Sequence, residues 1–110
     1  MENLKVEPVV APAVVFVVER RLLGVGPDHL AAVHRALAES ARRLSGRGDV
    51  VRYLRCTFLP DAARCLCVFE ANSVELVRRV NEVAQVPFDR IEEAIEFREP
   101  GGPIDRPARS

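Results

Sequence analysis

The feature that most constrains the fold is a valine-rich run near the N-terminus. Residues 13–20 read AVVFVVER, and no polar residue interrupts the apolar ones before Glu19. Valine favours strands, and an unbroken apolar strand is usually covered on both faces of its sheet. Even the longer run Val9–Val18, at ten residues, is too short to span a membrane as a helix. We therefore predict a covered strand and no membrane segment.

The next segments predict a helix followed by a hairpin. Apolar residues recur at three- and four-residue steps from Leu30 to Leu44, which predicts an amphipathic helix that starts near Asp28. Residues 49–58 and 65–71 are strand-like, and the Pro-Asp pair between them is typical of a turn.

A second helix and a last strand complete the pattern. Asn72, with Glu75 three residues on, is expected to cap the helix, and residues 90–97 read as a strand. The order predicts an α+β, ferredoxin-like βαββαβ domain, with a four-stranded antiparallel sheet and both helices on one face. We place this domain at residues 13–98, between an N-terminal arm (1–12) and a flexible C-terminal tail (99–110).

Charge and cysteine content exclude several classes of protein. Sixteen basic residues balance sixteen acidic ones, so no bulk positive field favours a nucleic acid or an anionic membrane. Three cysteines, an odd number clustered late in the chain, do not form a secreted disulfide framework. We expect reduced thiols and a cytoplasmic protein. Gly24-Val25-Gly26 lacks the other residues of a phosphate loop, so no cofactor is expected.

The hairpin register brings cysteines together. With a tight turn at Ala62, Cys56 lies opposite Cys67, on the same face as Cys65 and beneath the helices. We interpret the three as small core residues, with a redox or soft-metal role as the alternative. The Cys65-x-Cys67 spacing differs from that of zinc motifs.

The two histidines do not suggest a metal site. His29 and His34 are five residues apart in the first predicted helix, so they point in different directions. They are expected to face solvent, and no metal site is predicted.

The open face of the sheet is the predicted ligand site. By alternation, it is expected to carry Glu19, Tyr53, Arg55 and Glu70. These side chains could bind a small anionic or polar ligand or hold a dimer together; the alternative is a structural ion-pair network. Because the first strand is apolar on both sides, a second copy of the chain is the expected cover.

Four segments together resemble a known family. In chain order they are FVVER (16–20), VRYL (51–54), Asp61 followed by CVFEA (67–71), and PFDRI (87–91). Over residues 14–95 they resemble a bacterial family of small proteins, catalogued as a domain of unknown function, that includes nickel-binding, nickel-responsive members. The resemblance implies a ferredoxin-like homodimer.

The same resemblance speaks against a nickel site of the family's kind. Metal-binding members use histidines that align with Arg55 and with Val80 or Asn81, while Cys67 matches a family cysteine. None of the first three can replace an imidazole ligand.

We therefore expect a homodimeric binding protein rather than an enzyme, since no nucleophile–base set is present. The alternatives are an isomerase, cyclase or monooxygenase of the dimeric α/β barrel type, by analogy of fold, and a nickel-binding protein.

Overall fold

The computed structural model describes residues 13–46 and 49–97. The predicted arm (1–12) and tail (99–110) lie outside the described residues. The structure contains the following helices and strands: β1 (Ala13–Arg21), α2 (Pro27–Leu44), β2 (Val51–Leu59), β3 (Arg64–Ala71), α3 (Val74–Val83) and β4 (Arg90–Glu96). This order confirms the predicted βαββαβ pattern.

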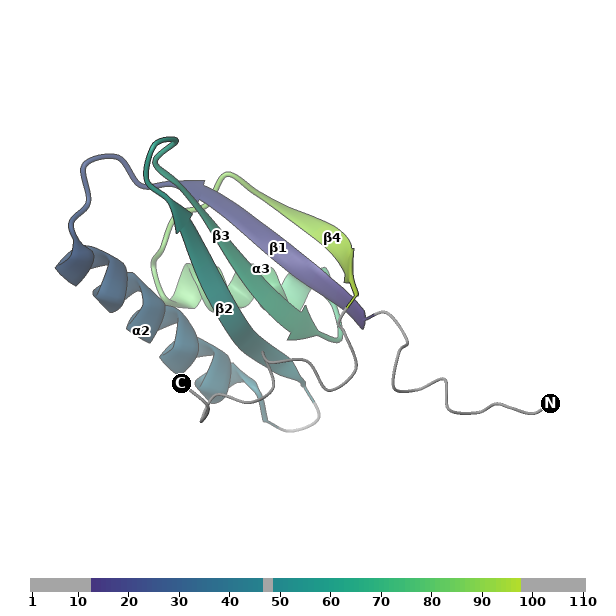
Figure 1. The fold of residues 1–110 in the computed structure, drawn as a ribbon. Helices are drawn as coiled ribbons and strands as arrows, with labels where there is room; N and C mark the ends of the chain where they lie inside the picture. Colours follow the sequence, from purple (N-terminus) through teal and green to yellow (C-terminus); the bar gives the residue numbers. More distant parts are fainter. Residues whose placement is uncertain (1–12, 47–48, 98–110) are drawn as a thin grey trace, which may run out of the picture.

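The four strands form one antiparallel sheet in the order β2-β3-β1-β4. Both helices lie on the same side of it (Figure 1). β1 is an inner strand with a hydrogen-bonded neighbour on each side, and its first six residues are apolar. Neither described helix has the length and apolar character needed to cross a membrane.

The core lies between the sheet and the two helices. Phe16, Val18 and Phe69 point from the sheet toward Leu37 of α2 and Val77 of α3, and all five are buried. Burying each such side chain contributes roughly 1.5–3 kcal/mol. The core therefore fixes which sheet face carries the helices.

The cap of α3 differs from the prediction. Ser73, not Asn72, is the N-cap, and its hydroxyl accepts a hydrogen bond from the Leu76 N–H at 3.4 Å. The Asn72 N–H instead donates to the Val50 carbonyl at 3.1 Å. The backbone of Asn72 thus continues the hydrogen bonding between β2 and β3, and the helix starts one residue later than predicted.

The hairpin register is as predicted near the turn and shifts farther along. Cys56 pairs with Cys67, as expected, but a bulge shifts the register between Tyr53 and Arg55. Tyr53 pairs with Phe69, whose side chain is in the core, whereas Arg55 pairs with Val68. The bulge therefore moves Tyr53 from the open face to the helix-covered face.

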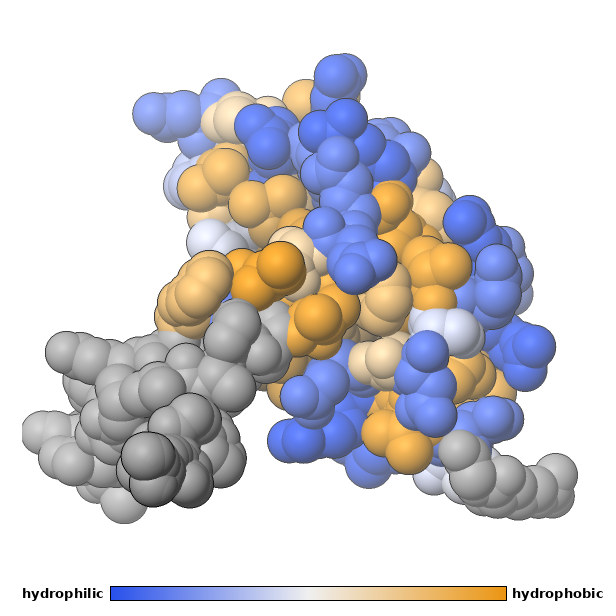
Figure 2. Space-filling view, turned by 90° about the vertical axis from the view of Figure 1, so that its right-hand side faces the viewer, coloured by the Kyte–Doolittle hydropathy of each residue, from blue (hydrophilic) through white to orange (hydrophobic). Residues whose placement is uncertain are grey.

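One end of the sheet exposes apolar side chains. Val14 and Ile95 pair across β1 and β4, and both are exposed, as is Phe97 just beyond β4. Seen from the β4 side, apolar surface lies between hydrophilic regions (Figure 2). On the same strand, Ile91 packs against the core instead.

Candidate functional site

The four residues predicted to share the open face do not form one cluster. Glu19 makes ion pairs with Arg64 (2.7 Å) and Arg90 (3.2 Å). Glu70 pairs with Arg52 at 2.9 Å. These pairs are those of a surface ion-pair network, the structural alternative to a ligand site.

Arg55 pairs with Glu96. These residues lie on β2 and β4, the two edge strands, so their ion pair reaches across the open face of the inner strands. The Arg55 guanidinium therefore already has a carboxylate partner.

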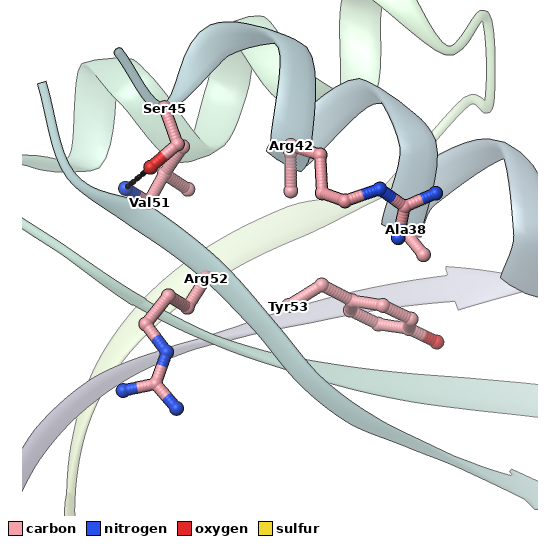
Figure 3. A pocket seen from close by; sticks show the side chains of 7 residues that line it. Ala38, Arg42, Ser45, Val51, Arg52 and Tyr53 are labelled. Carbon is pink, nitrogen blue, oxygen red and sulfur yellow. Dashed lines mark hydrogen bonds between the residues drawn. The ribbon is translucent and has the colours of Figure 1, made fainter. Parts of the chain in front are cut away.

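Tyr53 was wrongly placed by alternation. Its ring packs against Phe69, with ring centroids 5.2 Å apart, and its hydroxyl lies 2.8 Å from Nδ1 of His34 on α2. In Figure 3, Tyr53 lies beside β2 below α2, while its neighbour Arg52 points away from it. The side chains drawn there line a pocket of about 380 Å³ and come from the end of α2 and the start of β2.

The three cysteines form the most concentrated group of ligand atoms in the described part of the chain. The Sγ atom of Cys56 lies 2.7 Å from that of Cys65 and 2.9 Å from that of Cys67, and the latter two are 3.7 Å apart. Cys65 and Cys67 are buried, and Cys56 is half-buried. The strands explain this arrangement: residues 65 and 67 share a face of β3, and Cys56 lies opposite on β2.

A buried arginine lies next to this cluster. Arg20 is only 1% exposed and pairs with Cys65 in the β1–β3 register. Its guanidinium donates to the carbonyls of Val86 and Pro87 (3.3 Å each) and to Oδ1 of Asn81 (2.6 Å). Its Nε has no hydrogen-bond partner among the described residues. All three acceptors are neutral, so among residues 13–46 and 49–97 the buried positive charge near the sulfur atoms has no carboxylate partner.

The three thiols change one another's pKa values. A hydrogen bond from Cys65 and a smaller contribution from the one with Cys67 lower the pKa of Cys56 far below its usual range. The positive charge of Arg20 acts in the same direction. The same hydrogen bonds raise the pKa of Cys65, to about 11, and that of Cys67. Of the three thiols, Cys56 is therefore the one whose surroundings favour the thiolate.

A small pocket leads to the cluster. It has a volume of about 200 Å³, and Cys56 and Cys65 line it together with His34 and Phe58. Burial raises the pKa of Tyr53, so its hydroxyl stays protonated beside His34. His34 is exposed, as expected, but it also faces this pocket.

Sequence reasoning missed Arg20 and His34. The signal for Arg20 was available, because Phe16, Val18 and Arg20 alternate and Phe16 and Val18 are apolar core residues. For His34 no local signal exists, since its contact with Tyr53 depends on the bulge in β2.

The three positions that the sequence resemblance pairs with metal-binding histidines (Arg55, Val80 and Asn81) do not come together within this chain. Val80 and Asn81 are fully buried on the helix side of the sheet, and Asn81 is hydrogen-bonded to Arg20. Arg55 extends over the opposite face toward Glu96. The sheet therefore separates these positions.

Comparisons with known proteins agree with the fold and assign a family. The family model for nickel-responsive SCO4226-like proteins matches residues 16–93. The crystal structure of SCO4226 from Streptomyces coelicolor A3(2) superposes with a TM-score of 0.63 at 26% identity, covering 73% of this chain and 94% of that one. No curated protein matches the sequence. Since the matched segment is most of the chain, this protein belongs to the SCO4226-like family of nickel-responsive proteins.

Proposed function

We propose that this protein binds a thiophilic transition-metal ion through Cys56, Cys65 and Cys67. The observation that carries the proposal is the convergence of three sulfur atoms from two strands, all within 4.8 Å of one another. Thiolates are strong ligands for ions such as Zn²⁺ and bind borderline ions such as Ni²⁺ as well.

The spacing of the sulfur atoms is close to that of a metal-bound set. Sulfur ligands about 2.3 Å from a tetrahedral ion lie roughly 3.8 Å apart. Cys65 and Cys67 already lie 3.7 Å apart. Cys56 would move outward by about 1 Å to match the bond lengths of such a set. Its place on the edge strand β2, next to the bulge at Tyr53/Arg55, favours this adjustment.

The charge of the surroundings also favours a metal–thiolate set. Three thiolates carry three negative charges, which a divalent ion and the Arg20 guanidinium together balance. Such a neutral group is far less costly to bury than separate charges. Arg20, whose hydrogen-bond partners in the described part of the chain are neutral, thereby gains a counter-charge.

We propose His34, whose ring nitrogens lie outside the sulfur group itself, as the fourth ligand. It faces the pocket that Cys56 and Cys65 line. In the tautomer that donates from Nδ1 to the Tyr53 oxygen, Nε2 keeps the lone pair that a metal needs. Metal-bound histidines almost always have such a hydrogen bond on the other ring nitrogen.

The family assignment supports metal binding in general but not the ligands proposed here. Its name describes nickel-responsive proteins. In this chain the aligned positions carry Arg55, Val80 and Asn81, so the proposal moves the metal to a different set of side chains.

Titration of the reduced, metal-free protein with Co²⁺, Ni²⁺ and Zn²⁺ tests the proposal. We expect one ion per chain and, with Co²⁺ or Ni²⁺, an intense sulfur-to-metal charge-transfer band. Cys56→Ser, Cys65→Ser and Cys67→Ser should each abolish that band. His34→Ala should weaken binding about 10–100-fold. His29→Ala, which removes the other exposed histidine of α2, is the matched control and should bind like the wild type.

A charge-transfer band that persists in the three serine variants would contradict the proposal, as would stoichiometric Ni²⁺ binding without such a band. Weak binding that both histidine variants reduce equally would point to surface histidines instead.

We further propose that the open sheet face joins two copies of the chain. Val17 and Leu66 are half-buried there, on the face without helices, between the ion pairs of Glu19 and Arg55.

A small anionic ligand at this face would displace Glu96 from Arg55. Val17→Arg should convert a dimer to a monomer in sedimentation velocity, whereas a wild-type monomer would refute the interface.

A further inference from the structure

The metal-free cysteine cluster also has the geometry of a peroxide-reactive thiol with a resolving partner. Cys56 and Cys65 both line the pocket of about 200 Å³, but only Cys56 is half-buried, whereas Cys65 and Cys67 are 1% and 0% exposed. Exposure governs which thiol meets a solute first. Cys56 is therefore the thiol that an oxidant reaches.

The strand register selects the partner. Cys56 and Cys67 are directly opposite in the β2–β3 ladder, and their Sγ atoms lie 2.9 Å apart. Directly opposite residues have Cα atoms about 4.5–5.5 Å apart, within the range that a disulfide spans. The Sγ atom of Cys65 lies slightly nearer to that of Cys56, at 2.7 Å, so the sulfur distances do not select the partner. The backbone does, because Cys65 is diagonal to Cys56, where Cα atoms lie about 7–8 Å apart, beyond the usual limit for a disulfide.

We propose that Cys56 reacts with a hydroperoxide and then forms a disulfide with Cys67, leaving Cys65 as a free thiol. This goes beyond metal binding and requires no metal.

The reaction has two balanced steps. The Cys56 thiolate attacks the terminal peroxide oxygen, the O–O bond breaks, and the leaving oxygen takes a proton to become water or an alcohol. Cys56 is then a sulfenic acid. The Cys67 sulfur attacks the Cys56 sulfur, and the S–OH bond breaks. The hydroxide leaves as water with the proton of Cys67. The two thiols supply the two electrons that reduce the peroxide.

Arg20 lies on the same side of the sheet, opposite Cys65 in the register, and is buried. Its positive charge favours the anionic sulfur in the first step. The product disulfide uses two of the three proposed metal ligands, so oxidation and metal binding exclude one another.

Treatment of the reduced full-length protein with hydrogen peroxide, in the presence of a chelator, tests the proposal. We expect the count of reactive thiols to fall from the three of the sequence to one, reversibly with a dithiol reductant. The mass should fall by about 2 Da, and peptide mapping should join Cys56 to Cys67. Cys65→Ser should form the same disulfide. Cys67→Ser should stop at a sulfenic acid that a dimedone probe labels.

Cys56→Ser should consume peroxide at least about tenfold more slowly. Circular dichroism of each variant shows whether it is folded. An unchanged rate in folded Cys56→Ser, or a disulfide that includes Cys65, would overturn the proposal. So would three intact thiols in the wild type after peroxide treatment. Because the protein is metal-free throughout, these outcomes are independent of whether it binds a metal.

Discussion

Replacement of Arg20 by methionine should destabilise the fold substantially while keeping the packing of its aliphatic stem. The side chain is 1% exposed and donates hydrogen bonds to Val86, Pro87 and Asn81. A hydrogen bond from a charged group contributes about 1.5–3 kcal/mol, and its loss also leaves a buried acceptor unsatisfied.

The expected magnitude follows from these contacts. The two bonds to Val86 and Pro87 are long, at 3.3 Å, so the lower value applies, and the 2.6 Å bond to Asn81 takes a middle one. Together they are worth about 5 kcal/mol. Methionine also removes the buried, unpartnered Nε of Arg20, which returns roughly 1–2 kcal/mol. We therefore expect a net loss of about 3–4 kcal/mol, which most domains survive.

Urea denaturation followed by far-UV circular dichroism measures this loss as a shift of the midpoint at constant slope. Arg21→Met is the matched control, because the adjacent arginine is exposed, and it should change the free energy of unfolding by at most about 0.5 kcal/mol. A loss below about 1 kcal/mol for Arg20→Met would mean that the buried hydrogen bonds contribute little net stability, and the reasoning would be refuted.

Three further predictions concern the cap, the open face and pH. Ser73→Ala should lower the free energy of unfolding by about 1 kcal/mol in denaturation experiments, because the Ser73 side chain caps α3. Asn72→Ala should lower it clearly less. The reverse order would mean that Asn72 is the cap, as the sequence predicted. Arg55→Met should cost at most about 1 kcal/mol, an effect that high salt removes, since its pair with Glu96 is partly exposed. The apparent affinity for Zn²⁺ should rise with pH. The raised pKa values of the Cys65 and Cys67 thiols keep both protonated near neutrality, so the metal must displace their protons. An affinity that does not change with pH in calorimetry would exclude thiolate ligands.

The fold could be predicted because its signals are local and repeated. Each strand and helix carries its own periodicity, and the Pro60-Asp61 turn set the pairing of Cys56 with Cys67. The predicted cap of α3 was wrong by one residue, because Asn72 and Ser73 are both residue types that favour the N-cap position. Only the hydrogen bond from the Asn72 N–H to the Val50 carbonyl decides between them.

The sequence by itself determined the order of elements, the apolar inner strand β1 and the shared face of the three cysteines. The tertiary structure alone decided the rest of the site. A bulge before Arg55 moved Tyr53 to the helix side, where it contacts His34. Arg20 donates to Asn81 of α3 and to carbonyls of the loop after it, all more than sixty residues away. Alternation along a strand holds only while the pairing is regular, and it contains no information about which distant backbone carbonyls will accept a buried charge.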